Sequence, residues 1–120
     1  MGVVRRRAAD TFRWNDVPLE RYVAGEGGGT KQVLIGPDDG AASFAVRYFE
    51  IAPGGASSLD THAHDHGVVI LRGRGTVCLG DERHSLGVGD VVYVSPGEVH
   101  QFESAGPEPL GFLCVVPARR

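Results

Sequence analysis

Short apolar runs separated by turn residues fill most of this chain. Clusters of glycine, proline and aspartate interrupt the apolar positions roughly every 6 to 12 residues, and no stretch has the period of a convincing amphipathic helix. We expect strands at residues 31–35, 44–51, 57–71 (bent near its histidines), 76–79, 83–86, 91–94, 99–102 and 110–116. A chain with so many short strands closes its edges by folding two sheets together, which predicts an all-β sandwich or barrel.

Glycine supplies the turns that this pattern needs. It makes up 18 of the 120 residues, about twice its usual share. The pair Gly80-Asp81 predicts a two-residue hairpin turn. The segment Gly73 to Gly75 predicts a second hairpin, and the glycine-rich residues 25–30 predict a loop.

The first 30 residues have no clean hydrophobic period. Phe12, Trp14 and Tyr22 lie among polar residues, and Pro18 argues against a long helix. We expect residues 1–30 to form an extended N-terminal arm whose aromatic side chains pack on the body or on a partner subunit. Residues 31–117 would form the β-domain itself.

Charge and composition exclude some partners. The net charge is −3, which gives no general attraction to nucleic acid or to an anionic membrane, and no apolar run is long enough for a membrane span. The arginines at 5–7 are expected to be solvated, and no apolar stretch of a secretory signal follows them. Cys78 and Cys114 lie in separate apolar runs and are expected to be buried, reduced thiols. Together these features favour a cytoplasmic protein.

Candidate chemistry is concentrated at residues 60–66. His62, His64 and His66 occupy every second position, and Asp60 extends the same spacing backward. Alternate side chains of an extended strand point to one face. Imidazole and carboxylate groups suit Fe, Mn, Ni, Cu or Zn. Because the apolar run 68–71 follows directly, we expect the metal site to lie inside the β structure.

Two motifs resemble those of the cupin superfamily. The spacing from Gly54 through Asp60, His62 and His66 to Gly73 is similar to the first cupin motif, G-x5-H-x-H-x3-E-x6-G. Residues 89–100 (GDVVYVSPGEVH) resemble the second motif, in which a turn, an apolar strand and a proline–glycine turn lead to a histidine. The resemblance implies a double-stranded β-helix, or jelly-roll barrel, and looks closest to small single-domain bacterial cupins.

The resemblance also implies a ligand set. The metal ligands of the family fall on Asp60, His62, His66 and His100, with one divalent transition metal (Fe, Mn, Ni, Cu or Zn) per chain. Asp60 replaces the first motif histidine and His66 replaces the motif glutamate. His64 falls where the family has a non-ligand residue. The fourth ligand is therefore Asp60, His64 or water.

Other residues receive simpler assignments. His84 lies in a polar hairpin and is expected on the surface. Five residues are candidates for the lining of a cavity around the metal: Arg47, Tyr48, Phe49, Tyr93 and Phe102. For the aromatic residues among them, packing in the core is the alternative.

These features favour a metal-dependent oxygenase or dioxygenase that acts on a small organic molecule in the barrel. Ligands from distant segments leave positions on the ion open for substrate. Two alternatives remain: a non-catalytic module that senses or sequesters a small ligand or the metal, and a metal-assisted isomerase or lyase. The resemblance further implies a homodimer, in which a neighbour covers outer apolar residues such as Val69 and Leu71.

Overall fold

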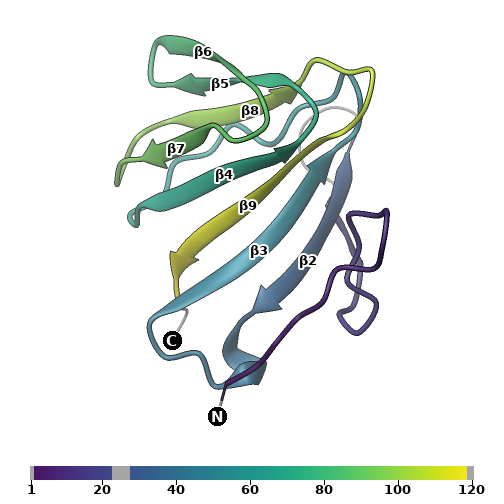
Figure 1. Cartoon of the computed structure of the whole chain (residues 1–120). Coiled ribbons are helices and arrows are strands. Elements are labelled where there is room, and N and C mark those ends of the chain that lie inside the picture. The colour runs from purple at the N-terminus through teal and green to yellow at the C-terminus, as the bar shows by residue number, and fades with distance from the viewer. Residues whose placement is uncertain (1, 23–27, 119–120) are drawn as a thin grey trace.

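The described chain folds into two antiparallel sheets. The computed structural model describes residues 2–22 and 28–118. Six strands form the larger sheet, in the order β1 (Glu20–Tyr22), β2 (Gly29–Ile35), β3 (Phe44–Ile51), β9 (Leu110–Pro117), β4 (His66–Arg72) and β7 (Val91–Val94). The smaller sheet has the order β6 (Glu82–Leu86), β5 (Gly75–Leu79) and β8 (His100–Ser104), and Figure 1 shows the two sheets together. The expected all-β fold is confirmed.

Strand alternation builds the core between the sheets. The odd residues of β3 and the even residues of β4, β7 and β9 face the smaller sheet, as the burial of Ile51, Ile70 and Leu110 shows. These three side chains have no exposed surface. Each fully buried aliphatic side chain contributes roughly 1.5–3 kcal/mol relative to an exposed one. The core thus holds the two sheets at a fixed separation around the site described below.

A short 3-10 segment, η1 (Pro37–Asp39), connects β2 to β3 and is the only helical element among the described residues. The N-terminal arm covers part of the outer face of the larger sheet (Figure 1). Trp14 is buried against Tyr48, with ring centroids 5.2 Å apart. The Gln32 amide donates hydrogen bonds to the carbonyls of Trp14 and Val17, at 2.8 and 2.9 Å. The arm also supplies β1, a strand that the sequence pattern did not indicate, which pairs with β2.

Two expectations about the chain between β3 and β5 were wrong. The strand expected at residues 57–71 begins only at His66. The residues before His66 instead pair with β8 and with the turn that precedes β8. The hairpin expected at Gly73 is absent, since β4 and β5 belong to different sheets and the chain crosses between them here. Gly73 has a φ of 74°, and a Cβ there would lie 2.3 Å from the carbonyl oxygen of Pro109.

The remaining turns are closer to expectation. Gly80 and Asp81 form the two-residue hairpin between β5 and β6, with Leu79 paired to Glu82 and a Gly80 φ of 62°. The loop expected at residues 25–30 lies partly outside the described residues, and its last two residues belong to β2. No helix in the described part of the chain is long and apolar enough to cross a membrane.

Candidate metal centre

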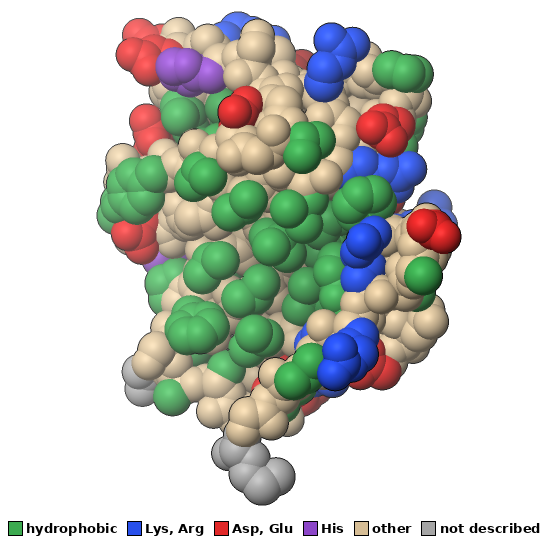
Figure 2. All heavy atoms as spheres, viewed as in Figure 1, with side chains coloured by type: hydrophobic (Ala, Val, Ile, Leu, Met, Phe, Trp, Pro, Cys, Tyr) green, Lys and Arg blue, Asp and Glu red, His purple; other side chains and the backbone are tan. Residues whose placement is uncertain are grey.

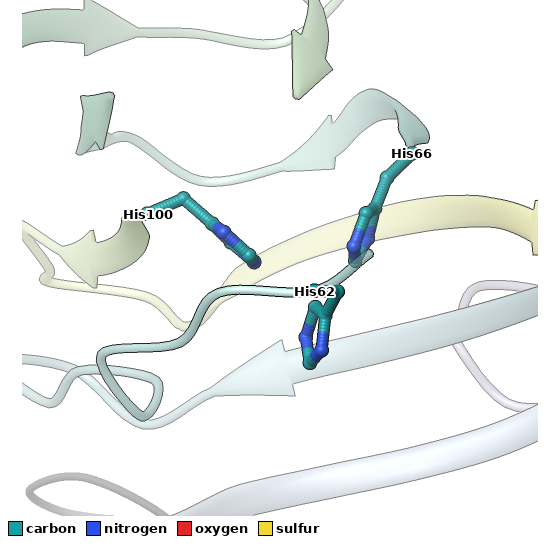
Figure 3. A group of neighbouring side chains, drawn as sticks. All are labelled: His62, His66 and His100. Atoms are coloured by element: carbon teal, nitrogen blue, oxygen red, sulfur yellow. The ribbon is translucent and has the colours of Figure 1, made fainter. Parts of the chain in front are cut away.

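Three histidines from two distant parts of the chain converge in the interior. His66 is the first residue of β4, His100 is the first residue of β8, and His62 lies in the irregular segment before β4. Each offers one ring nitrogen, and these atoms all lie within 4.8 Å of one another. Figure 3 shows the three side chains as neighbours, although they come from separate parts of the chain. Three convergent imidazoles at this spacing can hold one metal ion.

Main-chain hydrogen bonds hold the His62 segment against the start of β8. The amide of Asp60 donates to the carbonyl of His100 at 3.0 Å, and the amide of His100 donates back to Asp60 at 2.9 Å. The amide of Gly97 donates to the carbonyl of His62 at 2.6 Å. These bonds fix the backbone that carries two of the three histidines. The site is therefore preformed by the fold.

The free ring nitrogens are oriented for a cation. Nδ1 of His100 lies 3.0 Å from the carbonyl oxygen of Glu98. Because a carbonyl only accepts, Nδ1 carries the proton and Nε2 keeps its lone pair. Nδ1 of His66 faces the sulfur of Cys114 at 3.5 Å, and Nε2 of His66 is buried with no hydrogen-bond partner among the described residues. A buried polar atom without a partner is costly, and a metal ion satisfies it.

The environment of the site favours the neutral form of two of these histidines, His66 and His62. Burial, followed by the neighbouring rings and Arg47, lowers the pKa of His66 from 6.5 to about 4. Burial also lowers the pKa of His62, with a further contribution from His100. A neutral imidazole is the form that binds metal, so protons do not compete at neutral pH. The donor set suits Fe, Mn, Ni, Cu or Zn, as expected.

Asp60 and His64 lie next to the three histidines but outside the group whose ligand atoms converge. The Asp60 carboxylate accepts a hydrogen bond from the hydroxyl of Ser58 and lines the same cavity. The His64 ring stacks on that of His62, with centroids 5.1 Å apart and planes at 3°. A fourth protein ligand from either residue stays a prediction.

A cavity of about 190 Å³ opens beside the three histidines. Three of the five residues expected to line it do so: Arg47, Phe49 and Phe102. The expectation was wrong for Tyr48, which lies between Arg47 and Phe49 on β3 and so points to the opposite face, against Trp14. It was also wrong for Tyr93, which is 59% exposed and donates a hydrogen bond to Asp65 at 2.8 Å.

Five lining residues were not predicted from the sequence, and Cys114 is the one in contact with a histidine of the centre; the others are Ser57, Ser58, Val68 and Phe112. The sulfur of Cys114 lies between the ring of His66 and the guanidinium of Arg47, at 3.5 and 3.4 Å. The alternation of side chains along a strand could have predicted its position, because Leu110, Phe112 and Cys114 share the inward face of β9. Both cysteines are free thiols as expected, although Cys78 is only half-buried.

A β-barrel with a three-histidine centre that can bind a metal is the class of protein that the fold and site define. Residues 47–116 match the family model for the cupin domain. The chain is also 40% identical, over 114 residues, to the 1-methylthio-D-xylulose 5-phosphate methylsulfurylase of Rhodospirillum rubrum, covering 91% of this chain and 71% of the relative. The chain therefore belongs to the cupin family.

Solved structures support the same assignment. A cupin-2 domain protein from Rhodospirillum rubrum has a TM-score of 0.83 and 38% identity, over 96% of this chain and 78% of that chain. The polyketide cyclase RemF from Streptomyces resistomycificus has a TM-score of 0.80 and 27% identity, over 98% of this chain and 82% of that chain. The jelly-roll barrel expected from the two motifs is thus confirmed.

Proposed function

We propose that this cupin is a metal-dependent enzyme that acts on a carbonyl group of a small organic molecule in the barrel. The observation that carries the proposal is the buried, unpartnered Nε2 of His66, which shares its space with nitrogens of His62 and His100 beside a cavity. A divalent ion held there supplies Lewis acidity toward a carbonyl or enol oxygen. We further propose one such ion per chain.

The residues around the centre shape what enters it. Phe49, Phe102 and Phe112 form an apolar wall, and their stacked rings exclude water from one side of the cavity. Asp60 is the one carboxylate among the described lining residues. A carboxylate at this place can accept a proton from a carbon next to a substrate carbonyl, which is the role we propose for it.

The names of two relatives favour a carbonyl substrate. The Rhodospirillum rubrum relative is named for a xylulose phosphate, which is a ketose, and RemF is named for the cyclisation of polyketides. Both substrates contain ketone groups. Of the reactions that the sequence suggests, a metal-assisted isomerase or lyase agrees best with a ketone substrate.

The dioxygenase is the second candidate. It is favoured by the composition of the centre, because three imidazole ligands leave coordination positions on the ion open for other ligands and suit iron. If neither reaction is observed, the protein is the third candidate, a non-catalytic cupin that only binds a small ligand.

Turnover with and without oxygen separates these proposals. Protein purified without a nickel column would be loaded with Mn, Fe, Ni, Cu or Zn and incubated with hydroxyketones, 1-methylthio-D-xylulose 5-phosphate, diketones and phenols. We expect anaerobic turnover by the wild type and by His84→Ala, whose ring is exposed, and none by His66→Ala. Turnover only with oxygen consumption would favour the dioxygenase. Thermal stabilisation by ligands without any turnover would contradict an enzyme.

A homodimer is proposed for the outer face of the larger sheet. Val91, Tyr93 and Val115 on β7 and β9 are 71%, 59% and 38% exposed. Figure 2 shows hydrophobic side chains gathered over this face. Leu71 does not belong to this surface, because it packs against the Trp14 cluster, and Val69 is half-buried. Light scattering of the wild type and Val91→Lys would test the dimer.

The two free thiols agree with the proposed cytoplasmic location.

A further inference from the structure

Arg47 carries a positive charge into the cavity without an acidic partner. The arginines at 5, 13, 72 and 83 each pair with at least one carboxylate. No such pair involves Arg47 among the described residues, although it is half-buried and lines the cavity. Its Nε is buried and has no hydrogen-bond partner in this part of the chain. An uncompensated charge in such a place costs stability, so a functional reason is needed.

The Arg47 side chain is held in position by contacts with an aromatic ring and a thiol. Its guanidinium carbon lies 5.0 Å from the centroid of the Phe49 ring. One terminal nitrogen donates a hydrogen bond to the sulfur of Cys114 at 3.4 Å, and Cys114 in turn touches His66. These contacts orient the planar guanidinium without neutralising it. Arg47 therefore presents an available charge next to the three histidines.

We propose that Arg47 binds an oxyanion of the substrate, a carboxylate or a phosphate, while another part of the same molecule lies at the three histidines. This rests on the proposed function and names its substrate class. The guanidinium offers two parallel N–H donors that match a carboxylate or phosphate group. With a divalent ion bound, the positive charges of the ion and Arg47 outweigh the single charge of Asp60. Such a cavity attracts anions.

The size of the cavity limits the anion. At about 190 Å³, it is smaller than the roughly 300–1,000 Å³ typical of sites for drug-sized ligands. The acidic group and the reacting group must therefore lie close together in the substrate. A short keto acid or a small phosphorylated ketone meets this condition. The keto acid would present a carboxylate to Arg47, and the phosphorylated ketone would present a phosphate.

Binding of simple anions tests the proposal. Isothermal titration would measure inorganic phosphate, malonate and the neutral malonamide against the wild type, Arg47→Met and Arg47→Lys. The control variant is Arg74→Met, which removes an exposed arginine outside the cavity lining. We expect malonate or phosphate to bind about 10- to 100-fold more weakly to Arg47→Met, with Arg47→Lys in between and Arg74→Met unchanged. The stronger of the two anions identifies the source, and malonamide binds weakly to every variant.

The same titrations on metal-free protein separate this proposal from the proposed function. Anion binding that depends on Arg47 without metal supports the present inference even if no turnover is ever found. Equal affinities of the wild type and Arg47→Met, or no binding of either anion to the wild type, overturn it. Thermal denaturation tests a purely structural role, which predicts a lower Tm for Arg47→Met with anion affinity unchanged. We expect a Tm at least as high as that of the wild type.

Discussion

The sulfur of Cys114 lies 3.5 Å from Nδ1 of His66, on the opposite side of the ring from the unpartnered Nε2. For Nε2 to donate its lone pair to a metal, Nδ1 must carry the proton, and the sulfur is then its acceptor. A group behind a ligand histidine fixes the tautomer and the orientation of the ring. Cys114 is therefore a positioning residue for the metal centre.

Cys114→Val is expected to weaken metal binding about 10- to 100-fold, because the ring of His66 loses its partner while the volume of the core is kept. Cys114→Ser retains an acceptor and should lose less. Competition of Mn²⁺ or Zn²⁺ between the protein and a chelator measures the affinity. The matched control is Cys78→Val, which removes the half-buried thiol of the smaller sheet. Equal affinities of Cys114→Val and the wild type would show that the thiol plays no part in holding the ring.

Gly111→Ala is expected to destabilise the fold by about 1–3 kcal/mol. A Cβ at Gly111 would lie 2.0 Å from the hydroxyl of Tyr48, which donates a hydrogen bond to Glu50 at 3.0 Å. Gly67→Ala is the control, because Gly67 is also in a strand of this sheet and a Cβ there meets nothing within 4 Å. Urea unfolding measures both variants, and the double change Gly111→Ala with Tyr48→Phe should recover part of the loss. A Gly111→Ala variant as stable as Gly67→Ala would refute the close contact.

The stability of the metal-free protein is expected to fall as the pH drops from about 6.5 to about 4. Burial lowers the pKa of His66 from 6.5 to about 4 in the folded state. Between these values the unfolded chain binds the proton and the folded chain does not, so acid favours unfolding. Urea unfolding of the wild type and His66→Gln across this range isolates the contribution. A pH dependence identical in the two proteins would rule out His66 as its source.

Much of the framework follows from alternation and turn chemistry. The strands at Phe44–Ile51 and Val91–Val94 have the expected bounds, and Gly80-Asp81 turns the chain as expected. Local sequence is sufficient there because each strand has one buried face. It is insufficient for β1, whose pairing with β2 depends on how the arm lies along the sheet.

The candidate site shows the same division. The spacing and the motif resemblance selected His62, His66 and His100, and these are the three that converge. The reason first considered, a single strand that carries alternate histidines, was wrong, because tertiary hydrogen bonds hold His62 outside β4. Tyr48 and Phe49 are adjacent in a strand and cannot share a face, so alternation alone excluded one of them. The inward position of Cys114 could be predicted from its register with Leu110 and Phe112, but no motif marks it as part of the site.

Anomalous diffraction from crystals of the metal-loaded protein, recorded at the absorption edge of the bound metal, tests the metal centre most directly. We predict one strong peak per chain, in contact with ring nitrogens of His62, His66 and His100 and bordering the cavity that Arg47 lines. The absence of a peak between these three rings in metal-loaded crystals, or a peak held by other residues instead, would contradict the proposed centre.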